Sequence, residues 1–471
     1  MDAKLGARAL AGALGAWRAR EPAYEALADG IRLLCLDNRV PPHTALPAER
    51  ELASVLGVSR ATVAAAYRSL RASEHIVSLR GSGSVTLPLA RRAPVRTLVG
   101  AEGIDLQQAS PAAWPGLAAA FAETAADAAT IVSRPGYDIV GSPELRERLA
   151  AAYTARGLPT SADDILVTNG AQHAIHLVTA ALVGRGDRVV IESPTYPHAA
   201  EAIRSAGARL TALPVSTEDG WDLERATQAF ERTRPAAAYL MPWFQNPTGR
   251  TMTEVEATTL RALAQRVGTR LIIDETTADL SFDGTRAGEG GFGPHAIRIG
   301  SLGKTVWGGL RVGWVRADES FIRRLVALRP HRDLGTPEFE QAVATRLLDH
   351  MPEILAQRAR LLREGRDAAA DALRAHLPDW RVPEIGGGVS LWVRLDAPLS
   401  GALVMAARAR GVLLSAGPRF AVDGGHDRHL RVPITGPAEQ LRGAVAVLGE
   451  VWPVVRRGAP ARANDPVAAI V

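Results

Sequence analysis

Short apolar runs rich in β-branched residues alternate with longer segments of helical periodicity from about residue 106 onward. Strands that alternate with crossover helices form a mainly parallel sheet, so the pattern predicts a large α/β domain. Helical patterns occupy, for example, residues 172–184 and 253–267, and residues from about 320 to 456 predict helices followed by a smaller α/β portion. The runs expected to be strands are 164–168, 188–193, 236–242, 270–275, 296–301 and 311–317.

The N-terminal residues follow a different pattern, with short helices and then a hairpin. Residues 48–55 predict one helix, Gly57 supplies a turn, and Ser59 caps a second helix that runs to about Ala72. Residues 76–87 then carry two β-like runs on either side of a glycine-containing tip. This order predicts a helix-turn-helix with a β-hairpin wing, mostly α in its content.

Four regions follow from these patterns. They are a winged helix-turn-helix over residues 1–86, a Pro- and Arg-containing linker over 87–105, the α/β domain over 106–456, and a tail over 457–471 that we expect to be disordered.

The charge of the chain is concentrated at its N-terminus. The first 95 residues hold 13 of the 55 Lys and Arg and 8 of the 50 Asp and Glu, so they account for the whole net charge of +5. Such an excess is typical of a surface that binds a polyanion. The single cysteine, Cys35, excludes an intrachain disulfide and favours the cytoplasm, and no apolar run is long enough to predict a membrane span.

Double-stranded DNA is the partner that the N-terminal pattern favours. The second helix of a helix-turn-helix enters the major groove, the first lies near the phosphates, and a wing reaches the adjacent groove. A helical hairpin that only packs on the larger domain is the alternative, but the order of the elements favours DNA binding. The expected DNA contacts are Arg50, Ser59, Arg60, Thr62, Arg68, Arg80 and Gly81.

Lysine is almost absent from the chain. Of 55 basic residues only Lys4 and Lys304 are lysine. A Schiff base needs an amine that can lose its proton, and a guanidinium cannot do this. By composition alone, an ordinary surface lysine explains Lys304 as well as a Schiff-base lysine does.

Two stretches resemble known families. Residues 24–87 contain L-P-x-x-R-x-L-A followed by L-G-V-S-R-x-T-V and A-Y, the form of the GntR-family winged helix-turn-helix. Residues 106–456 resemble a fold-type I aminotransferase, and the fusion resembles the MocR subfamily of GntR regulators. The resemblance implies pyridoxal 5'-phosphate (PLP) as cofactor, a head-to-tail homodimer, and an amine or PLP itself as effector.

The same resemblance assigns roles around PLP. Lys304, in Ser301-Leu302-Gly303-Lys304, would carry the Schiff base, while Ser301 and Arg311 would hold the phosphate. Asp274, at the end of a predicted strand, would face the pyridine nitrogen and keep it protonated. Asn246 would hydrogen-bond the 3-oxygen of the ring.

Further roles lie at the edges of the predicted site. Backbone N–H groups at the helix start formed by Gly170, Ala171 and Gln172 suit a phosphate. Tyr196 would stack on the ring. Tyr137 would reach the phosphate of the neighbouring subunit, and Arg431 would bind a substrate carboxylate.

One position departs from the aminotransferases. Three residues after Asp274 those enzymes usually have a tyrosine that touches the 3-oxygen, and this chain has Thr277. The change removes one hydrogen bond and argues against efficient transamination, while the other PLP contacts remain.

We therefore expect a regulator in which PLP, or a PLP–amine adduct on Lys304, modulates operator binding. A working aminotransferase with a regulatory DNA-binding domain is the main alternative, and steady turnover of an amino acid would identify it. A third hypothesis, a scaffold that binds nothing, predicts a colourless protein.

Overall fold

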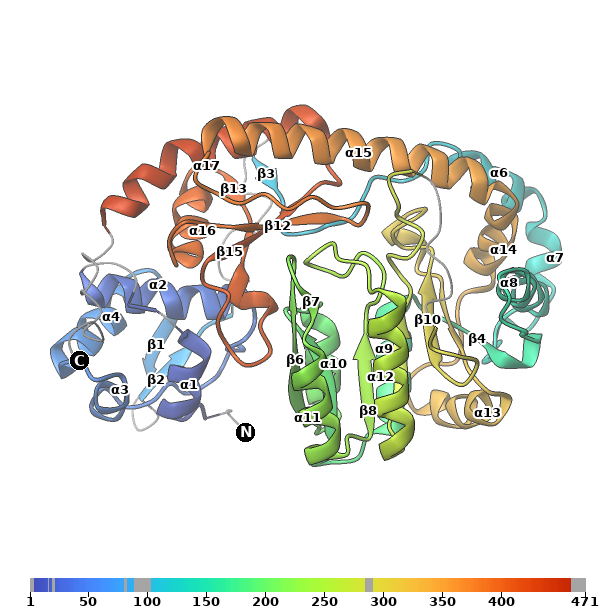
Figure 1. Ribbon diagram of the computed structural model, residues 1–471, viewed down its shortest axis with the longest axis horizontal. Helices are drawn as coiled ribbons and strands as arrows, with labels where there is room; N and C mark the ends of the chain where they lie inside the picture. The colour runs from blue at the N-terminus through green and yellow to red at the C-terminus, as the bar shows by residue number, and fades with distance from the viewer. Residues whose placement is uncertain are drawn as a thin grey trace.

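The computed structural model describes residues 4–15, 17–18, 22–79, 83–88, 103–283 and 291–458. Arg80 and Gly81 at the predicted hairpin tip, residues 89–102 of the predicted linker, and residues 459–471 of the predicted tail lie outside these ranges. Figure 1 shows three units, which we call the head, the large lobe and the small lobe. In the part of the chain that is described, no helix is long and apolar enough to cross a membrane.

The head is the winged helix-turn-helix that the sequence predicts. Its turn is formed by Gly57, whose φ of 65° lies in the left-handed region that glycine adopts without strain. The hydroxyl of Ser59 then accepts a hydrogen bond from the backbone N–H of Thr62, which caps the second helix as expected. The elements of the head are α1 (Ala7–Leu14), α2 (Ala23–Leu36), α3 (Glu49–Leu56), α4 (Arg60–Ala72), β1 (Ile76–Leu79) and β2 (Gly83–Thr86).

The large lobe is built on an eight-stranded sheet. Strands β6, β5, β8, β9 and β10 run parallel, while β7, β11 and β4 join by antiparallel pairing, so the prediction of a mainly parallel sheet is confirmed. In sheet order the strands are β4 (Ile165–Thr168), β11 (Gly313–Arg316), β10 (Ile297–Ser301), β9 (Arg270–Asp274), β8 (Ala237–Leu240), β5 (Arg188–Ser193), β6 (Arg209–Ser216) and β7 (Gly220–Trp221).

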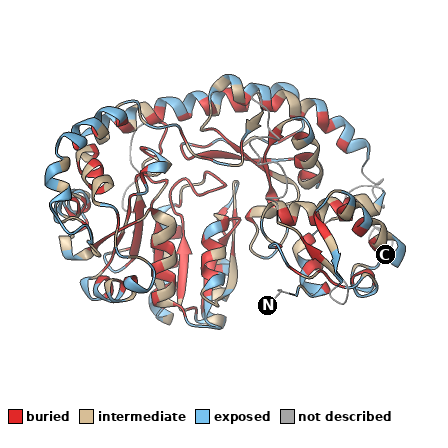
Figure 2. Cartoon of the chain, turned by 180° about the vertical axis from the view of Figure 1, so that it is seen from behind, coloured by how far each residue is buried: buried red, intermediate tan, exposed pale blue. Residues whose placement is uncertain are grey.

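Helices cover both faces of this sheet. Alternate residues of the central strands pack against α9, α10 and α13 on one face and against α11 and α12 on the other, which makes the strands buried throughout. Figure 2 shows these strands as buried. The helices are α6 (Leu117–Ala126), α7 (Ala128–Val132), α8 (Pro143–Ala155), α9 (Ala171–Leu182), α10 (Pro197–Ser205), α11 (Leu223–Thr233), α12 (Glu254–Val267), α13 (Glu319–Leu328) and α14 (Glu338–Leu347). Short 3-10 turns are η2 (Ala162–Asp164), η3 (Gly308–Leu310), η4 (Arg329–His331) and η5 (Leu348–His350).

The small lobe combines a three-stranded antiparallel sheet, in the order β12-β15-β14, with a parallel pair β13-β3. The pair places Ile104–Asp105, the last two residues of the predicted linker, in the lobe as β3. Its elements are β3 (Ile104–Asp105), α15 (Met351–His376), β12 (Ser390–Arg394), α16 (Ser400–Ala409), β13 (Val412–Leu413), β14 (Ser415–Ala416), η6 (Gly417–Phe420), β15 (His429–Pro433) and α17 (Ala438–Arg457).

The head lies against the small lobe. Helix α2 contacts α16, and Leu33 of α2 packs on the core of the small lobe. Beside this contact, Arg39 Nη1 of the head donates to the carbonyl of Pro418 in η6 at 3.3 Å. Figure 1 shows the head in blue below the orange small lobe, with α15 running from that lobe across the top of the large lobe.

Candidate cofactor and ligand site

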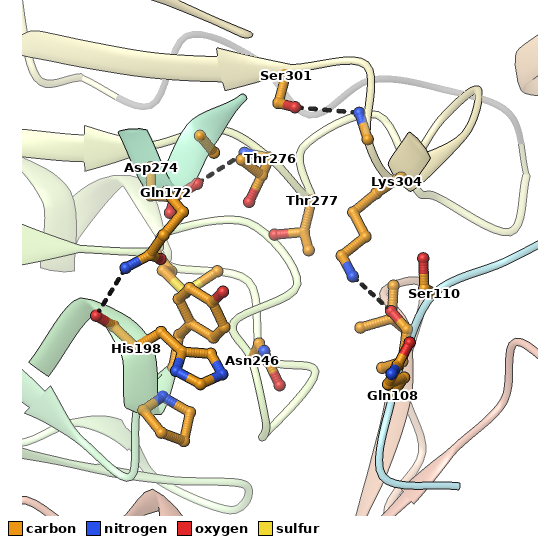
Figure 3. Close-up of a pocket in the computed structure, with 18 of the residues that line it drawn as sticks. Gln108, Ser110, Gln172, His198, Asn246, Asp274, Thr276, Thr277, Ser301 and Lys304 are labelled. Carbon is orange, nitrogen blue, oxygen red and sulfur yellow. Dashed lines mark hydrogen bonds between the residues drawn. The ribbon is translucent and has the colours of Figure 1, made fainter. Parts of the chain in front are cut away.

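A cavity of about 540 Å³ opens at the carboxyl ends of the parallel strands, and parts of the small lobe line its other side. This is the edge at which open α/β sheets bind ligands, because loops from several strands meet there. Nine of the predicted site residues line it: Ala171, Gln172, Tyr196, Asn246, Asp274, Ser301, Lys304, Arg311 and Arg431. Figure 3 shows Lys304 facing Asp274 and Asn246 across this cavity.

Lys304 lies on the loop after β10, and its Nζ donates to the carbonyl of Ala109 at 2.6 Å. Burial lowers the pKa of its amine to about 8, and the nearby charge of Arg431 acts in the same direction. Asp274 opposes the shift. The result is an amine that is neutral, and therefore nucleophilic, in a larger fraction of molecules than a solvated lysine.

Asp274 ends β9 and is 2% exposed. Its carboxylate accepts from the backbone N–H of Thr276 at 2.9 Å and from the hydroxyl of Tyr239. Burial raises the pKa of Asp274, while these hydrogen bonds lower it by favouring the charged form. Tyr239 was missed from the sequence, although a tyrosine inside an apolar strand signals a hydroxyl that needs a buried partner.

One end of the cavity is suited to a phosphate. Arg311 donates from Nη2 to the carbonyl of Asn169 at 2.7 Å and lies directly on Gly170. A Cβ on Gly170 would come within 2.7 Å of that guanidinium, and the φ of 82° at this position is one that other residues rarely adopt, which favours glycine there. Gly170 does not itself line the cavity, but it precedes α9, whose N-terminus favours an anion. Ser301 Oγ accepts from the backbone N–H of Gly303 at 3.0 Å and donates to the carbonyl of Val312.

Polar atoms in the middle of the cavity remain without partners. Asn246 is 8% exposed, and its Oδ1 has no hydrogen-bond partner in the described part of the chain; the same holds for Gln172 Oε1. Burial raises the pKa of Tyr196, the predicted stacking residue, to about 12, so its phenol stays protonated. Thr277 donates to the carbonyl of Trp243 at 2.7 Å, which means that its hydroxyl serves the backbone.

At the opposite end Arg431 projects from β15 and is 7% exposed. Its guanidinium carbon lies 4.8 Å from the centre of the Phe420 ring, and Nη2 donates to the carbonyl of Gln107. Burial lowers its pKa to about 10, which leaves it charged at neutral pH. A second arginine, Arg419, also lines this end, and no sequence signal distinguished it from the many other arginines of the chain.

Tyr137 lies elsewhere. It is 73% exposed and does not line the cavity of its own chain, so its predicted contact with a neighbouring subunit remains a prediction.

The described residues predicted to contact DNA gather on the helix-turn-helix. Arg50, Ser59, Arg60 and Arg68 are exposed, and Thr62 is partly buried. Arg60 forms an exposed ion pair with Glu49 at 3.4 Å. The Ser59 hydroxyl is already used as the helix cap, so it has less capacity for DNA than its position suggested.

The residues of the cavity fit PLP. A buried carboxylate, an amine with a lowered pKa, an arginine beside a helix N-terminus and an unpartnered Asn246 oxygen are the groups that PLP would require. Lys304 would hold it covalently, Asp274 would face its ring nitrogen, and Arg311 and Ser301 would hold its phosphate.

The lowered pKa of Lys304 gives a pH-dependent prediction. With a pKa of about 8, about a tenth of Lys304 is neutral at pH 7, against fewer than about one in a thousand for a solvated lysine. The rate at which PLP attaches to cofactor-free protein, followed by visible absorbance, should rise with pH and level off above about 8. Arg431→Gln should move that midpoint to higher pH, because it removes a charge that lowers the pKa. A wild-type midpoint near the ordinary lysine value would contradict the assignment.

Comparisons with known proteins agree with this geometry. The family model for aminotransferase class I and II matches residues 117–448, and the model for bacterial regulatory proteins of the gntR family matches residues 23–85. The HTH-type transcriptional regulator YdfD of Bacillus subtilis is 27% identical over 445 residues, covering 86% of this chain and 91% of that protein.

Transaminases match the lobes. The 2-aminoadipate transaminase of Thermus thermophilus is 30% identical over 322 residues, covering 66% of this chain and 81% of that protein. The crystal structure of LysN, the α-aminoadipate aminotransferase of Thermus thermophilus in complex with N-(5'-phosphopyridoxyl)-L-leucine, superposes with a TM-score of 0.69 at 26% identity, covering 77% of this chain and 95% of that one. The chain therefore belongs to the class I and II aminotransferase family, joined to a gntR-family helix-turn-helix in the MocR arrangement.

Proposed function

We propose that this protein is a transcription regulator that binds double-stranded DNA through the head and PLP through the cavity between the lobes. PLP, alone or joined to a small amine at Lys304, modulates the affinity of the head for its operator. When bound, PLP supplies an aldehyde that condenses with amines and a ring that withdraws electrons. The residues of the chain bind and orient it, as Asp274, Lys304 and Arg311 are placed to do.

The observation that carries this proposal is the position of η6. Arg419 and Phe420 of this turn line the cavity, and the Phe420 ring supports Arg431. One residue earlier, the carbonyl of Pro418 accepts from Arg39 of the head. A ligand that draws Arg431 or Arg419 toward itself therefore acts on the segment that contacts the head. It changes operator affinity only to the extent that it binds two arrangements of η6 with different affinity.

The assembly and location are part of the same proposal. A head-to-tail homodimer would present two heads to the two halves of an operator and would let the exposed Tyr137 reach the cavity of the neighbouring subunit. We place the protein in the cytoplasm, where a DNA-binding regulator meets its operator.

Transamination is the alternative function, and one observation favours it. Arg431 is buried, charged and in the same cavity as Lys304 and Asp274, which is the set of groups that an amino-acid substrate requires. Steady conversion of an amino acid to its keto acid, with both half-reactions sustained, would assign this function. Binding without sustained turnover would assign the cavity to sensing.

Operator affinity should depend on PLP and on the Lys304 amine. We expect the affinity for the DNA upstream of the protein's own gene, measured at fixed salt by fluorescence anisotropy, to change when PLP is added. Lys304→Ala should abolish the change, and so should Lys304→Arg, which retains the charge but lacks a reactive amine. Tight binding that is equal with and without PLP in all three proteins would rule out the sensing role.

Arg60 should contribute directly to DNA binding. Arg60→Ala is expected to weaken operator binding by about 5- to 150-fold if the side chain reads a base. Glu49→Ala is the matched control, because it breaks the same ion pair but leaves the arginine in place. Equal affinity of wild type and Arg60→Ala at the same salt concentration would remove Arg60 from the interface.

Tyr239 should position Asp274 for the cofactor. Tyr239→Phe removes a hydrogen bond to a buried carboxylate, so PLP affinity should fall by roughly 10- to 100-fold. Tyr153→Phe is the matched control, since Tyr153 donates to the buried neighbour Glu275 at 2.9 Å and does not line the cavity. If the two variants lose PLP affinity equally, the effect is general destabilisation and Tyr239 has no specific role.

A further inference from the structure

A second cavity lies where the head and both lobes meet. It has a volume of about 290 Å³, and we call it the junction cavity. The head contributes part of α1 and the segment after α2, the large lobe contributes α10 and the loop before it, and the small lobe contributes η6. It is distinct from the cofactor cavity, although Pro197, Arg419 and Phe420 line both.

Three arginines, one from each unit, line the junction cavity. They are Arg39 of the head, Arg204 of the large lobe and Arg419 of the small lobe. Arg39 donates to the carbonyl of Pro418 at 3.3 Å, and Arg204 donates to the carbonyl of Val422 at 2.8 Å. Neither has a carboxylate within 4 Å in the described ranges of the chain.

The arginines are close enough for the charge of one to affect the pKa of another. Burial is the main cause of the lowered pKa of both Arg39 and Arg204. Asp37 opposes the shift at Arg39 and Glu201 opposes it at Arg204, while the charge of Arg419 lowers the pKa of each. The fold holds these positive charges close together at the cavity. A bound anion would reduce the repulsion between them.

Among the described residues, only one acidic side chain lines the cavity together with the arginines. Glu201 pairs with Arg419 at 2.6 Å and also with His198 at 2.8 Å. Burial acts to raise the pKa of Glu201, but these contacts outweigh it and lower the pKa to about 2. Asp37 lies near Arg39 and Arg419 but does not line the cavity, and burial raises its pKa to about 6. Asp427 also lies near Arg39 and does not line the cavity. Of these three carboxylates, therefore, only Glu201 lines the cavity beside the three arginines.

A neutral donor accompanies the arginines. Thr195 lines the junction cavity and is 1% exposed, and its hydroxyl has no hydrogen-bond partner among the described residues. A buried hydroxyl without a partner costs free energy. An oxyanion in the cavity is the kind of acceptor that would satisfy it.

We propose that the junction cavity is a binding site for a small anion that carries a phosphate or carboxylate group. Arg39 and Arg204 donate to its oxygens. The head and the two lobes each form part of the wall of the cavity. Such a ligand holds the head against both lobes, because its contacts exist only when the three units are together. It thereby favours one placement of the head.

Titration calorimetry of the full chain, saturated with PLP, tests this with inorganic phosphate and with succinate as probes. We expect at least one probe to bind, with a dissociation constant that increases about tenfold or more in Arg39→Gln and in Arg204→Gln. Arg324→Gln is the matched control for Arg204→Gln, since Arg324 is also a helical arginine without an ion pair in the described structure but does not line the junction cavity. It should bind as the wild type does.

The two probes and one further variant separate the outcomes. Binding of phosphate alone assigns a phosphate-bearing ligand, and binding of succinate alone assigns a carboxylate. Loss of phosphate binding in Arg311→Gln, with Arg39→Gln and Arg204→Gln unaffected, places the anion in the cofactor cavity and overturns the proposal. Binding of neither probe overturns it as well. None of these measurements depends on DNA affinity. They therefore test the anion site separately from the proposed regulation of DNA binding by PLP.

Discussion

Asp274 carries a carboxylate at a point where water scarcely reaches it, and the arrangement of the cofactor cavity depends on how that charge is sustained. A buried carboxylate is stable only if hydrogen bonds or an opposite charge replace its hydration. Tyr239 from the neighbouring strand and the backbone of Thr276 supply two of these bonds. The parallel pairing of β8 with β9 brings the first donor into range. Lys304 lies across the cavity, where the same burial disfavours its charged form.

Local patterns in the sequence predicted the elements that depend on local chemistry. The Gly57 turn and the Ser59 cap determine where α3 ends and α4 begins, and both signals are contained within a few residues. The central strands were recognisable because burial on both faces makes them apolar throughout, as in β5 and β9. By contrast, β12, β14 and β15 were not identified as separate strands. Their short runs become a sheet only through pairing between segments distant in the chain.

The site shows the same division between local and distant information. Lys304 and Asp274 were predicted because their residue types and spacing match a known chemistry, and both line the cavity. Tyr239 and Arg419 were missed because their significance lies in what the fold places beside them. Thr277 was singled out from the sequence, but the partner of its hydroxyl was not, because the carbonyl of Trp243 belongs to a residue 34 positions away in the chain.

Helix α15 has a mechanical consequence for the head. Its 26 residues run from the large lobe to the small lobe, and beyond Pro352 in its first turn they hold no proline, which gives a rod of about 39 Å. At Gly365 the missing side chain lets the rod lie against the backbone of Ile434, where a Cβ would come within 2.1 Å of the carbonyl oxygen. The rod and the small lobe are thus fastened together, and the head rests on that lobe. A tilt of about 5° at the large-lobe end would sweep the far end through roughly 3 Å. Arg358 of α15 donates to the carbonyls of Thr305 and Val306, just after Lys304, so a small shift of that loop would be magnified at the small-lobe end of the rod.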